Sequence, residues 1–360
     1  MRGYVSMIAA VLSAAIAART PPIALFEAVG LTADQRAAVD AGRAVAKVLP
    51  WGGPSEIYIF GAVHVDGSSE TYLRTARNVR GFAGMPGYLA VGEFHDEPTV
   101  DDINALTFES DDVKALKTCR EGACDVQLPT TAMRALREAI DFSRPDAVAQ
   151  ASTLARPMVV RLLRSYQQGG NQALGEYRDK QNPSRVGEQF ETLIARASAL
   201  PDVLPELRRY LLEYPHVALA NSESFFYWER VDFGLKPTIR VNHAVIYHGR
   251  AAGHDFSALA IKQLYATHYF HTALDVSVCV DDEAGGRARG FYLLTLKGSQ
   301  QEGLTGMKGS LVRKVVVDKT RGSLETALGS IKRLVEHTEV ANAVRPETTP
   351  AGPVLRAIRR

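Results

Sequence analysis

Cysteine is scarce in this sequence, with three residues among 360. That number excludes a small scaffold held by many disulfides and any zinc site built from four cysteines. An excess of one charge is also lacking, because 42 lysines and arginines stand against 40 aspartates and glutamates. Phosphate-binding surfaces usually need a concentrated basic patch, and no basic block runs through the body of the chain. We therefore expect no nucleic-acid partner.

Motifs for metals, phosphates and common enzyme chemistries are lacking too. No hydrolase, zinc-protease or dinucleotide motif occurs in a fitting context. The acidic residues between positions 93 and 102 do not follow the spacing of a calcium-binding loop. The segment 298–303 begins like a phosphate loop, but Leu304 stands where lysine belongs, so we interpret it as a hairpin connection. A lid or an anion-binding turn is the alternative interpretation. No metal and no cofactor are expected.

Long apolar runs are absent after the N-terminus. Residues 1–18 combine Arg2, an alanine-rich apolar stretch and Ala15-Ile16-Ala17, which has the form that precedes signal-peptidase cleavage. This run is shorter than the about 20 apolar residues that cross a membrane. We predict a signal peptide over 1–17 and a periplasmic or secreted mature protein without a transmembrane segment. An uncleaved anchor or a buried helix is the alternative.

The cysteines that are present agree with export. Cys119 and Cys124 are separated by four residues, including Gly122, which predicts a short disulfide loop in an oxidising compartment. Redox-active pairs normally have two intervening residues, and a metal site would need further ligands nearby. Two free thiols, or a redox or metal role, are the alternatives. Cys279 lies in an apolar alternating segment and is expected to be a small buried side chain.

Hydrophobic periodicity divides the rest of the chain into four parts. Residues 18–98 are predicted to hold a helix over 32–49, strands over 56–65 and 87–94, and a helix from Ser69 to about Val79. Residues 99–214 show apolar spacings of three and four between prolines, which predicts a large all-helical insertion. The tail, residues 338–360, carries three prolines and no apolar stripe, so we expect it to be disordered.

The remaining part, residues 215–337, changes to a period of two. Its successive strands have no long helix between them, which indicates an antiparallel meander. A final amphipathic helix begins at Ser323 and carries its apolar stripe to Val335. The fold class is therefore predicted to be α+β, an antiparallel sheet with a C-terminal helix and a helical insertion. The strands expected in this part cover residues 217–233, 238–247, 264–280, 290–297 and 311–317.

The order of these elements resembles the helix-grip arrangement of START-like proteins, a superfamily that includes lipid-transfer domains and polyketide cyclases. The resemblance rests on the strand Tyr58 to Asp66 with the helix after it, on the 217–297 meander and on residues 311–336, about half of the chain. It implies a cavity between the long C-terminal helix and the curved sheet that holds an apolar ligand. It implies no particular reaction, because members include carriers and enzymes.

Candidate ligand-binding residues come from the polar and aromatic cluster around His268. If residues 264–280 form one strand, His268 points with the apolar set and His271 points away, which argues against a shared metal site. His268 is then a polar anchor for a ligand, a hydrogen-bonded core histidine or, as a further alternative, a catalytic group. The residues expected to line the cavity are Leu264, His268, Phe270 and Leu274, extended by Phe226 and Trp228 on another strand.

Three functions follow from this sequence, in order of preference. The first is non-catalytic binding or transport of a hydrophobic small molecule or lipid outside the cytoplasm. The second is a cyclase- or aromatase-like enzyme in which His268 acts with Tyr265 or Tyr269 as acid–base groups. The third is a structural or interaction protein of the cell envelope, with the helical insertion as its partner surface. The sequence identifies neither the ligand of the first function nor the protein partner of the third.

Overall fold

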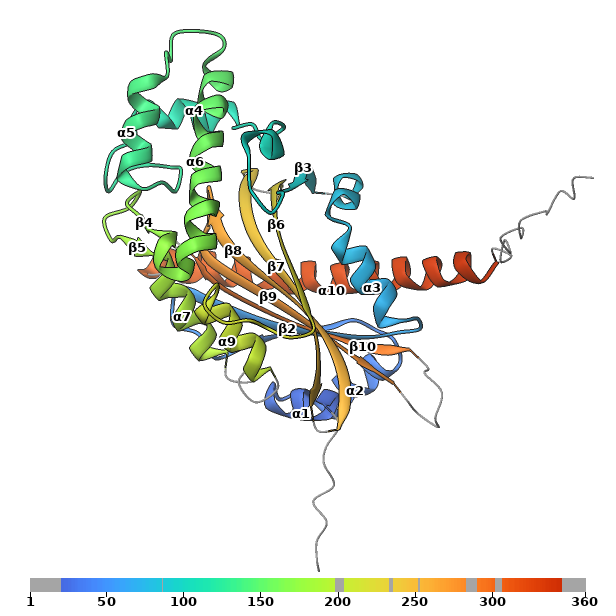
Figure 1. Cartoon of the computed structure of the whole chain (residues 1–360). Coiled ribbons are helices and arrows are strands. Elements are labelled where there is room, and N and C mark those ends of the chain that lie inside the picture. The colour runs from blue at the N-terminus through green and yellow to red at the C-terminus, as the bar shows by residue number, and fades with distance from the viewer. Residues whose placement is uncertain are drawn as a thin grey trace, which may run out of the picture.

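A computed structural model describes residues 21–85, 87–197, 204–232, 236–251, 253–282, 290–301 and 306–344 (Figure 1). The predicted signal peptide, 1–17, lies outside the described residues, as does 345–360 of the predicted tail. None of the helices in these described segments is long and apolar enough to cross a membrane.

An eight-stranded antiparallel sheet forms the centre of the molecule, in the order β1-β2-β10-β9-β8-β7-β6-β3. Five consecutive strands, β6 to β10, form the predicted meander, and the N-terminal β2 pairs with the last of them. With the long C-terminal helix, this arrangement confirms the predicted α+β class. The strands are β1 (Val45–Leu49), β2 (Glu56–Val65), β3 (Tyr88–Glu93), β6 (Ser222–Val231), β7 (Thr238–Ala251), β8 (His254–Ala266), β9 (Phe270–Asp281) and β10 (Phe291–Gln301).

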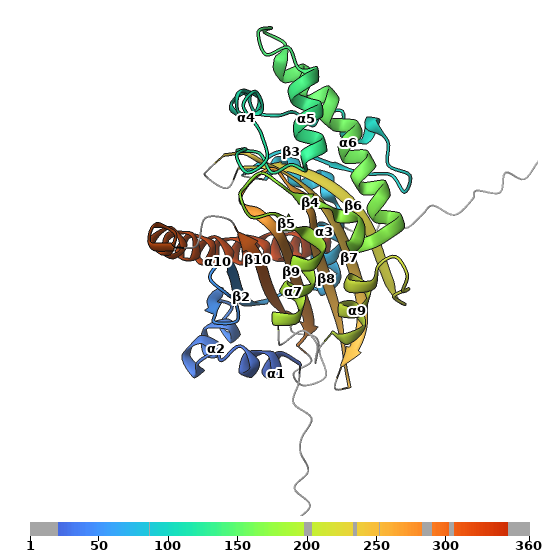
Figure 2. The same cartoon turned by 90° about the vertical axis from the view of Figure 1, so that its left-hand side faces the viewer.

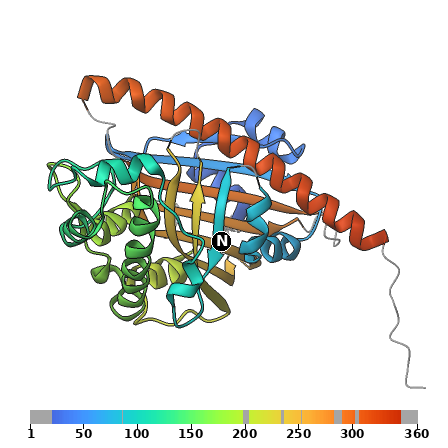
Figure 3. The same cartoon turned by 90° about the horizontal axis from the view of Figure 1, so that it is seen from above.

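One face of the sheet is covered by α10 (Gly306–Val344), with α3 (Ser69–Arg77) and η1 (Val79–Gly84) beside it. Leu324 and Leu328 of α10 lie over Gly61 of β2, where a Cβ would be only 2.7 Å from a methyl group of Leu328. Glycine at this position therefore allows the helix to approach the strand closely. Figure 3 shows α10 running along this side of the sheet, with both of its ends beyond the strands.

The opposite face is covered by four shorter helices that share one apolar core with the sheet. They come from the N-terminus and from the end of the helical insertion, residues 99–214. The phenol of Tyr58 on β2 donates a hydrogen bond of 3.0 Å to the carbonyl of Leu193 and ties this layer to the sheet. The four helices are α1 (Pro21–Ala28), α2 (Ala33–Asp40), α7 (Val186–Arg196) and α9 (Pro205–Glu213).

The first part of the helical insertion forms a second core on the same face, at the end of β6, β7 and β8 (Figure 2). Trp228 of β6, 1% exposed, anchors it by donating a hydrogen bond of 2.9 Å to the carbonyl of Asp102. The insertion is not purely helical, because it includes a small two-stranded ribbon. Its elements before α7 are η2 (Val100–Ile103), α4 (Ser110–Leu116), α5 (Thr130–Ala139), α6 (Ala147–Gly169), η3 (Gly170–Leu174), β4 (Glu176–Tyr177) and β5 (Ser184–Arg185).

Several predicted elements differ in the structure. The strand expected over 217–233 is shorter, because β6 covers only Ser222–Val231. The helix expected over 32–49 ends at Asp40, and Val45–Leu49 instead pairs with β2 as strand β1. The strand expected over 311–317 belongs to α10, which starts at Gly306 and continues to Val344, into the predicted tail. In the latter two cases long-range packing overrides the local pattern. β1 forms the edge of the sheet. Val316 and Val317 pack against the apolar core between α10 and the sheet, called the α10-face core below.

The strand expected over 264–280 is in fact two strands. β8 ends at Ala266 and β9 begins at Phe270, because Tyr269 adopts a φ of 63° in the left-handed region and reverses the chain. The register also shifts between Val241 and Asn242, a bulge that lets Leu264 and Tyr265 both enter the core under the insertion. The alternation expected across residues 264–280 is therefore interrupted at the bulge and at the turn, but it holds within β9, where Leu274, Val276 and Val278 face one side and Cys279 the other.

Candidate functional site

The predicted ligand-binding residues do not line a common wall beneath α10. Leu264, Phe226 and Trp228 are buried in the core under the helical insertion, whereas Leu274 belongs to the core under α7 and α9. Phe270 is partly exposed next to the guanidinium of Arg240, 6.0 Å from its ring centre. The α10-face core is formed by other residues. Leu264, Leu274, Phe226 and Trp228 thus share one face of the sheet, but it is the face opposite α10, where helices of the insertion cover them.

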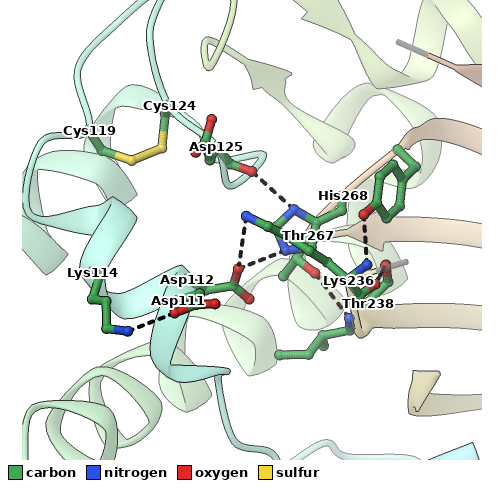
Figure 4. A network of polar contacts seen from close by, with 12 residues as sticks. Asp111, Asp112, Lys114, Cys119, Cys124, Asp125, Lys236, Thr238, Thr267 and His268 are labelled. Carbon is green, nitrogen blue, oxygen red and sulfur yellow. Dashed lines mark hydrogen bonds and ion pairs between the residues drawn. A yellow bond between two sulfur atoms is a disulfide. The ribbon is translucent and has the colours of Figure 1, made fainter. Parts of the chain in front are cut away.

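The side chain of His268 is buried and makes polar contacts that connect the β8–β9 turn to the helical insertion (Figure 4). These contacts are called the His268 joint below. Its Nδ1 donates to the carbonyl of Asp125 at 3.0 Å, and its Nε2 lies 3.0 Å from a carboxylate oxygen of Asp112. The side chains of His268 and Asp112 are 4% and 3% exposed. The ammonium of Lys236 approaches the same carboxylate at 4.0 Å. His268 therefore contacts two segments of the insertion, the backbone at Asp125 and the side chain of Asp112 on α4.

The disulfide supports this joint. The structure joins Cys119 to Cys124, as predicted, with 4.5 Å between their Cα atoms. Cys119 follows α4, which carries Asp112, and Cys124 precedes Asp125, so the bridge holds together the two segments that contact His268 (Figure 4). The backbone N–H of Gln127 then donates to the carbonyl of Thr267 at 2.9 Å. The bridge therefore stabilises the docking of the insertion onto the turn.

The two tyrosines considered as acid–base partners of His268 are engaged in the same joint. The phenol of Tyr265 donates to the carbonyl of Gln127 at 3.0 Å, and the phenol oxygen of Tyr269 accepts from the backbone N–H of Lys236 at 2.9 Å. His271 lies elsewhere, 3.1 Å from the hydroxyl of Ser184, and burial lowers its pKa to about 4. These contacts give His268, Tyr265 and Tyr269 structural partners on the insertion and before β7.

A second buried polar cluster escaped the sequence analysis. Lys262 of β8 has no exposed surface, and its ammonium donates to the phenol of Tyr166 at 3.1 Å, to the carbonyl of Leu211 at 3.3 Å and to the side-chain oxygen of Asn171. Burial holds the pKa of Lys262 well below its usual value of 10.5, with a small opposing effect from Glu191. The signal was available, because Lys262 interrupts an inward-facing row of apolar residues.

His243 of β7 completes this cluster. Its Nδ1 lies 3.1 Å from the phenol oxygen of Tyr166, and its ring is stacked on Phe226 with centres 4.6 Å apart. Burial lowers the pKa of His243 well below 6.5, and the nearby charge of Lys262 lowers it further. Tyr214 lies against the same ring at 4.7 Å. The cluster is enclosed by aromatic side chains and connects α6 to the sheet.

A cleft of about 730 Å³ opens at the other end of the sheet from the first part of the insertion. It lies where β7 and β8 extend beyond the start of β6, between the segment 217–221 and α9. Apolar side chains and charges of both signs meet there. Its lining includes Glu206, Arg209, Ala220, Tyr247, His248 and Arg250.

Polar contacts organise the walls of this cleft. The phenol of Tyr247 donates to the carboxylate of Glu206, and burial together with this acceptor raises the pKa of Tyr247 to about 12. On the other side, the Nδ1 of His248 lies 2.9 Å from the hydroxyl of Ser257. Arg250, nearer the hairpin tip, is 3.7 Å from the exposed carboxylate of Asp255. The cleft thus offers donors and acceptors at its rim and an aromatic ring inside.

Apolar cavities within the cores are much smaller. One, under α1, holds about 20 Å³ and is lined by residues such as Leu25 and Phe60. Another, between α7 and the sheet, holds about 10 Å³. Spaces of this size accommodate one water molecule at most. Neither could hold a lipid without large rearrangement of the core.

Comparison with known proteins gives no assignment: no protein-family model matches the chain, and no curated protein matches its sequence.

Proposed function

We propose that this protein binds a small amphipathic molecule in the cleft between the β7–β8 hairpin and α9. The observation that carries the proposal is the cleft itself, whose volume of about 730 Å³ lies in the range typical of ligand sites. Its mixed walls suit a ligand with an apolar part and polar ends. The sequence analysis favoured an apolar ligand beneath α10. The cleft changes both the expected place and the expected class of ligand.

Binding is proposed in preference to catalysis because of the contacts of His268. His268, the residue expected to transfer protons in the enzyme alternative, is 4% exposed and lies between Asp125 and Asp112. A general acid or base must be within hydrogen-bond reach of the substrate. The long C-terminal helix on an antiparallel sheet supports, as a proposal, a place near START-like proteins. The Cys119–Cys124 bridge supports an extracytoplasmic location, since such bonds persist in oxidising compartments.

A matched pair of variants tests the cleft. Protein purified from its native envelope is examined by native mass spectrometry for a co-purifying small molecule. Ala220→Trp places a large ring in the cleft from an exposed position, and Ala135→Trp makes the same change on the exposed surface of α5. We expect the bound mass to be lost in the first variant and retained in the second. Retention of the same ligand by Ala220→Trp would show that the cleft is not its site.

A further inference from the structure

The cleft exists because the β6–β7 ladder stops early. Ser222 pairs with Tyr247, and the backbone N–H of His248 donates to the carbonyl of Asn221 at 3.0 Å. Continuing that register would place Leu219 opposite Arg250. Instead, Asn221 adopts a φ of 52°, in the left-handed region, and the preceding chain turns away from β7. The space left beside β7 is the cleft.

This interruption leaves one edge of β7 without a neighbouring strand. Residues two apart in a strand direct their backbone groups to the same side. Since the N–H of His248 points toward β6, the N–H and C=O of Arg250 point toward the cleft, away from β8. Within the described segments, the backbone of Arg250 makes no hydrogen bond on that side. Such an unpaired edge is a template for another extended chain.

The charged residues of the cleft also suit an extended chain as the ligand. Arg209 and Arg250 supply positive charge, and Glu206 and Asp255 supply negative charge. A short peptide carries an ammonium and a carboxylate at its two ends, so both kinds of group can be met. Tyr247 and Phe256 line the cleft with rings 5.8 Å apart, but the two residues are only 5% and 6% exposed, so they form its floor.

We infer that the cleft binds a short peptide in an extended conformation, which takes the place of the missing continuation of β6 and pairs with the backbone of Arg250. This mode is β-strand addition, in which main-chain hydrogen bonds supply affinity and pockets select side chains. The inference rests on the proposed function and specifies the ligand class.

Two substitutions of Arg250 distinguish the contribution of its backbone N–H to binding from that of its side chain. Arg250→Ala keeps the backbone N–H, whereas Arg250→Pro removes it, and proline is tolerated where the N–H of an edge strand faces away from its neighbour. The probe is tetra-alanine with free termini, titrated calorimetrically into the full chain. We expect Arg250→Pro to bind it about tenfold more weakly than Arg250→Ala, the effect of one hydrogen bond. Equal affinity of the two variants would overturn the inference.

Hydrogen exchange gives an independent readout on the unaltered protein. Addition of tetra-alanine should slow exchange of the Arg250 amide, because that N–H gains an acceptor, and should leave the amide of Ala135 on α5 unchanged. An unchanged Arg250 amide at saturating tetra-alanine would also overturn the inference. If a non-peptide ligand is displaced by Ala220→Trp while tetra-alanine does not bind, the inference fails and the proposed function stands. If Ala220→Trp changes the binding of neither the co-purifying molecule nor tetra-alanine, the proposed function fails as well.

Discussion

The Nε2 atom of His268 and a carboxylate oxygen of Asp112 lie 3.0 Å apart, in a contact with almost no exposure to solvent. The two residues are separated by more than a hundred positions in the sequence. Their contact therefore joins the helical insertion to the sheet. Removal of one member of a buried polar contact leaves the other with an uncompensated cost of desolvation, whereas breaking an exposed ion pair costs little.

The first prediction concerns this contact. His268→Leu should lower the free energy of unfolding by about 1–3 kcal/mol, because Asp112 loses its nearest polar neighbour and keeps only Lys236, at 4.0 Å. The double variant with Asp112→Leu should be less destabilised than the sum of the single changes. Urea unfolding measures all three. Lys114→Ala breaks the exposed contact with Asp111 on the same helix and serves as a control that should leave the urea midpoint unchanged. Additive effects of His268→Leu and Asp112→Leu would contradict the assignment.

The second prediction concerns pH and Lys262. Its pKa is lowered by folding, so below pH 10.5 the unfolded chain binds more protons at this site than the folded chain does. Stability should therefore rise with pH by up to about 1.4 kcal/mol per pH unit, until the unfolded lysine also loses its proton.

Lys262→Met removes this contribution while keeping an unbranched side chain. The free energy of unfolding of the original protein should rise, relative to that of Lys262→Met, between pH 7 and pH 9. Urea titrations at several pH values measure the difference, and Lys114→Met provides an exposed control. Stability curves that run parallel for the original protein and Lys262→Met would show that Lys262 is charged when folded.

The third prediction concerns the disulfide. Since the Cys119–Cys124 loop is short, its loss should cost about 2 kcal/mol by the loop-entropy relation. The double variant Cys119→Ser/Cys124→Ser should still fold, but backbone amides at Gln127 and Thr267 should exchange faster because the docked loop is less restrained. Peptide mapping after alkylation checks the bridge itself. Two alkylated thiols in protein exported from the cell would be incompatible with it.

The fourth prediction concerns the packing of α10. Leu328 is 1% exposed and lies against Gly61, so Leu328→Asp buries a carboxylate among apolar groups and should prevent stable folding. Leu328→Ala should fold with a loss of about 2–5 kcal/mol. Leu334, 39% exposed on the same helix, is the matched control, and Leu334→Asp should melt within a few degrees of the original protein. Similar melting temperatures for Leu328→Asp and Leu334→Asp would contradict the role given to this helix.

Several elements were predictable because their determinants are local. The β-branched and aromatic run of Glu56–Val65 became β2 with the expected bounds. Thr32 begins the predicted helix and caps α2 by accepting from the backbone N–H of Gln35. Cys119 and Cys124 are close in the chain, so their bridge required little knowledge of the fold. In each case the signal and the structure that it predicts lie within a few residues.

Other features were decided by contacts that local patterns do not contain. Residues 45–49 follow a helical pattern but become a strand, because β2 offers them a hydrogen-bonding edge. Residues 311–317 have strand-like composition but continue α10 across the sheet. The left-handed conformations of Tyr269 and Asn221, neither of them glycine, end one strand and one ladder. The turn at Asn221 leaves the space that forms the cleft, and the predicted cavity residues lie on the face opposite α10.

The sequence by itself determined the α+β class, the antiparallel meander, the disulfide pair and the apolar stripe of the C-terminal helix, because periodicity and spacing act along the chain. Only the tertiary structure decided that His268 is a joint, that Lys262 is buried and that β7 carries an unpaired edge at Arg250. Each of these depends on which distant segment arrives beside the residue. Burial and hydrogen-bond partners depend on how distant segments are arranged in space. Local sequence patterns do not encode that arrangement.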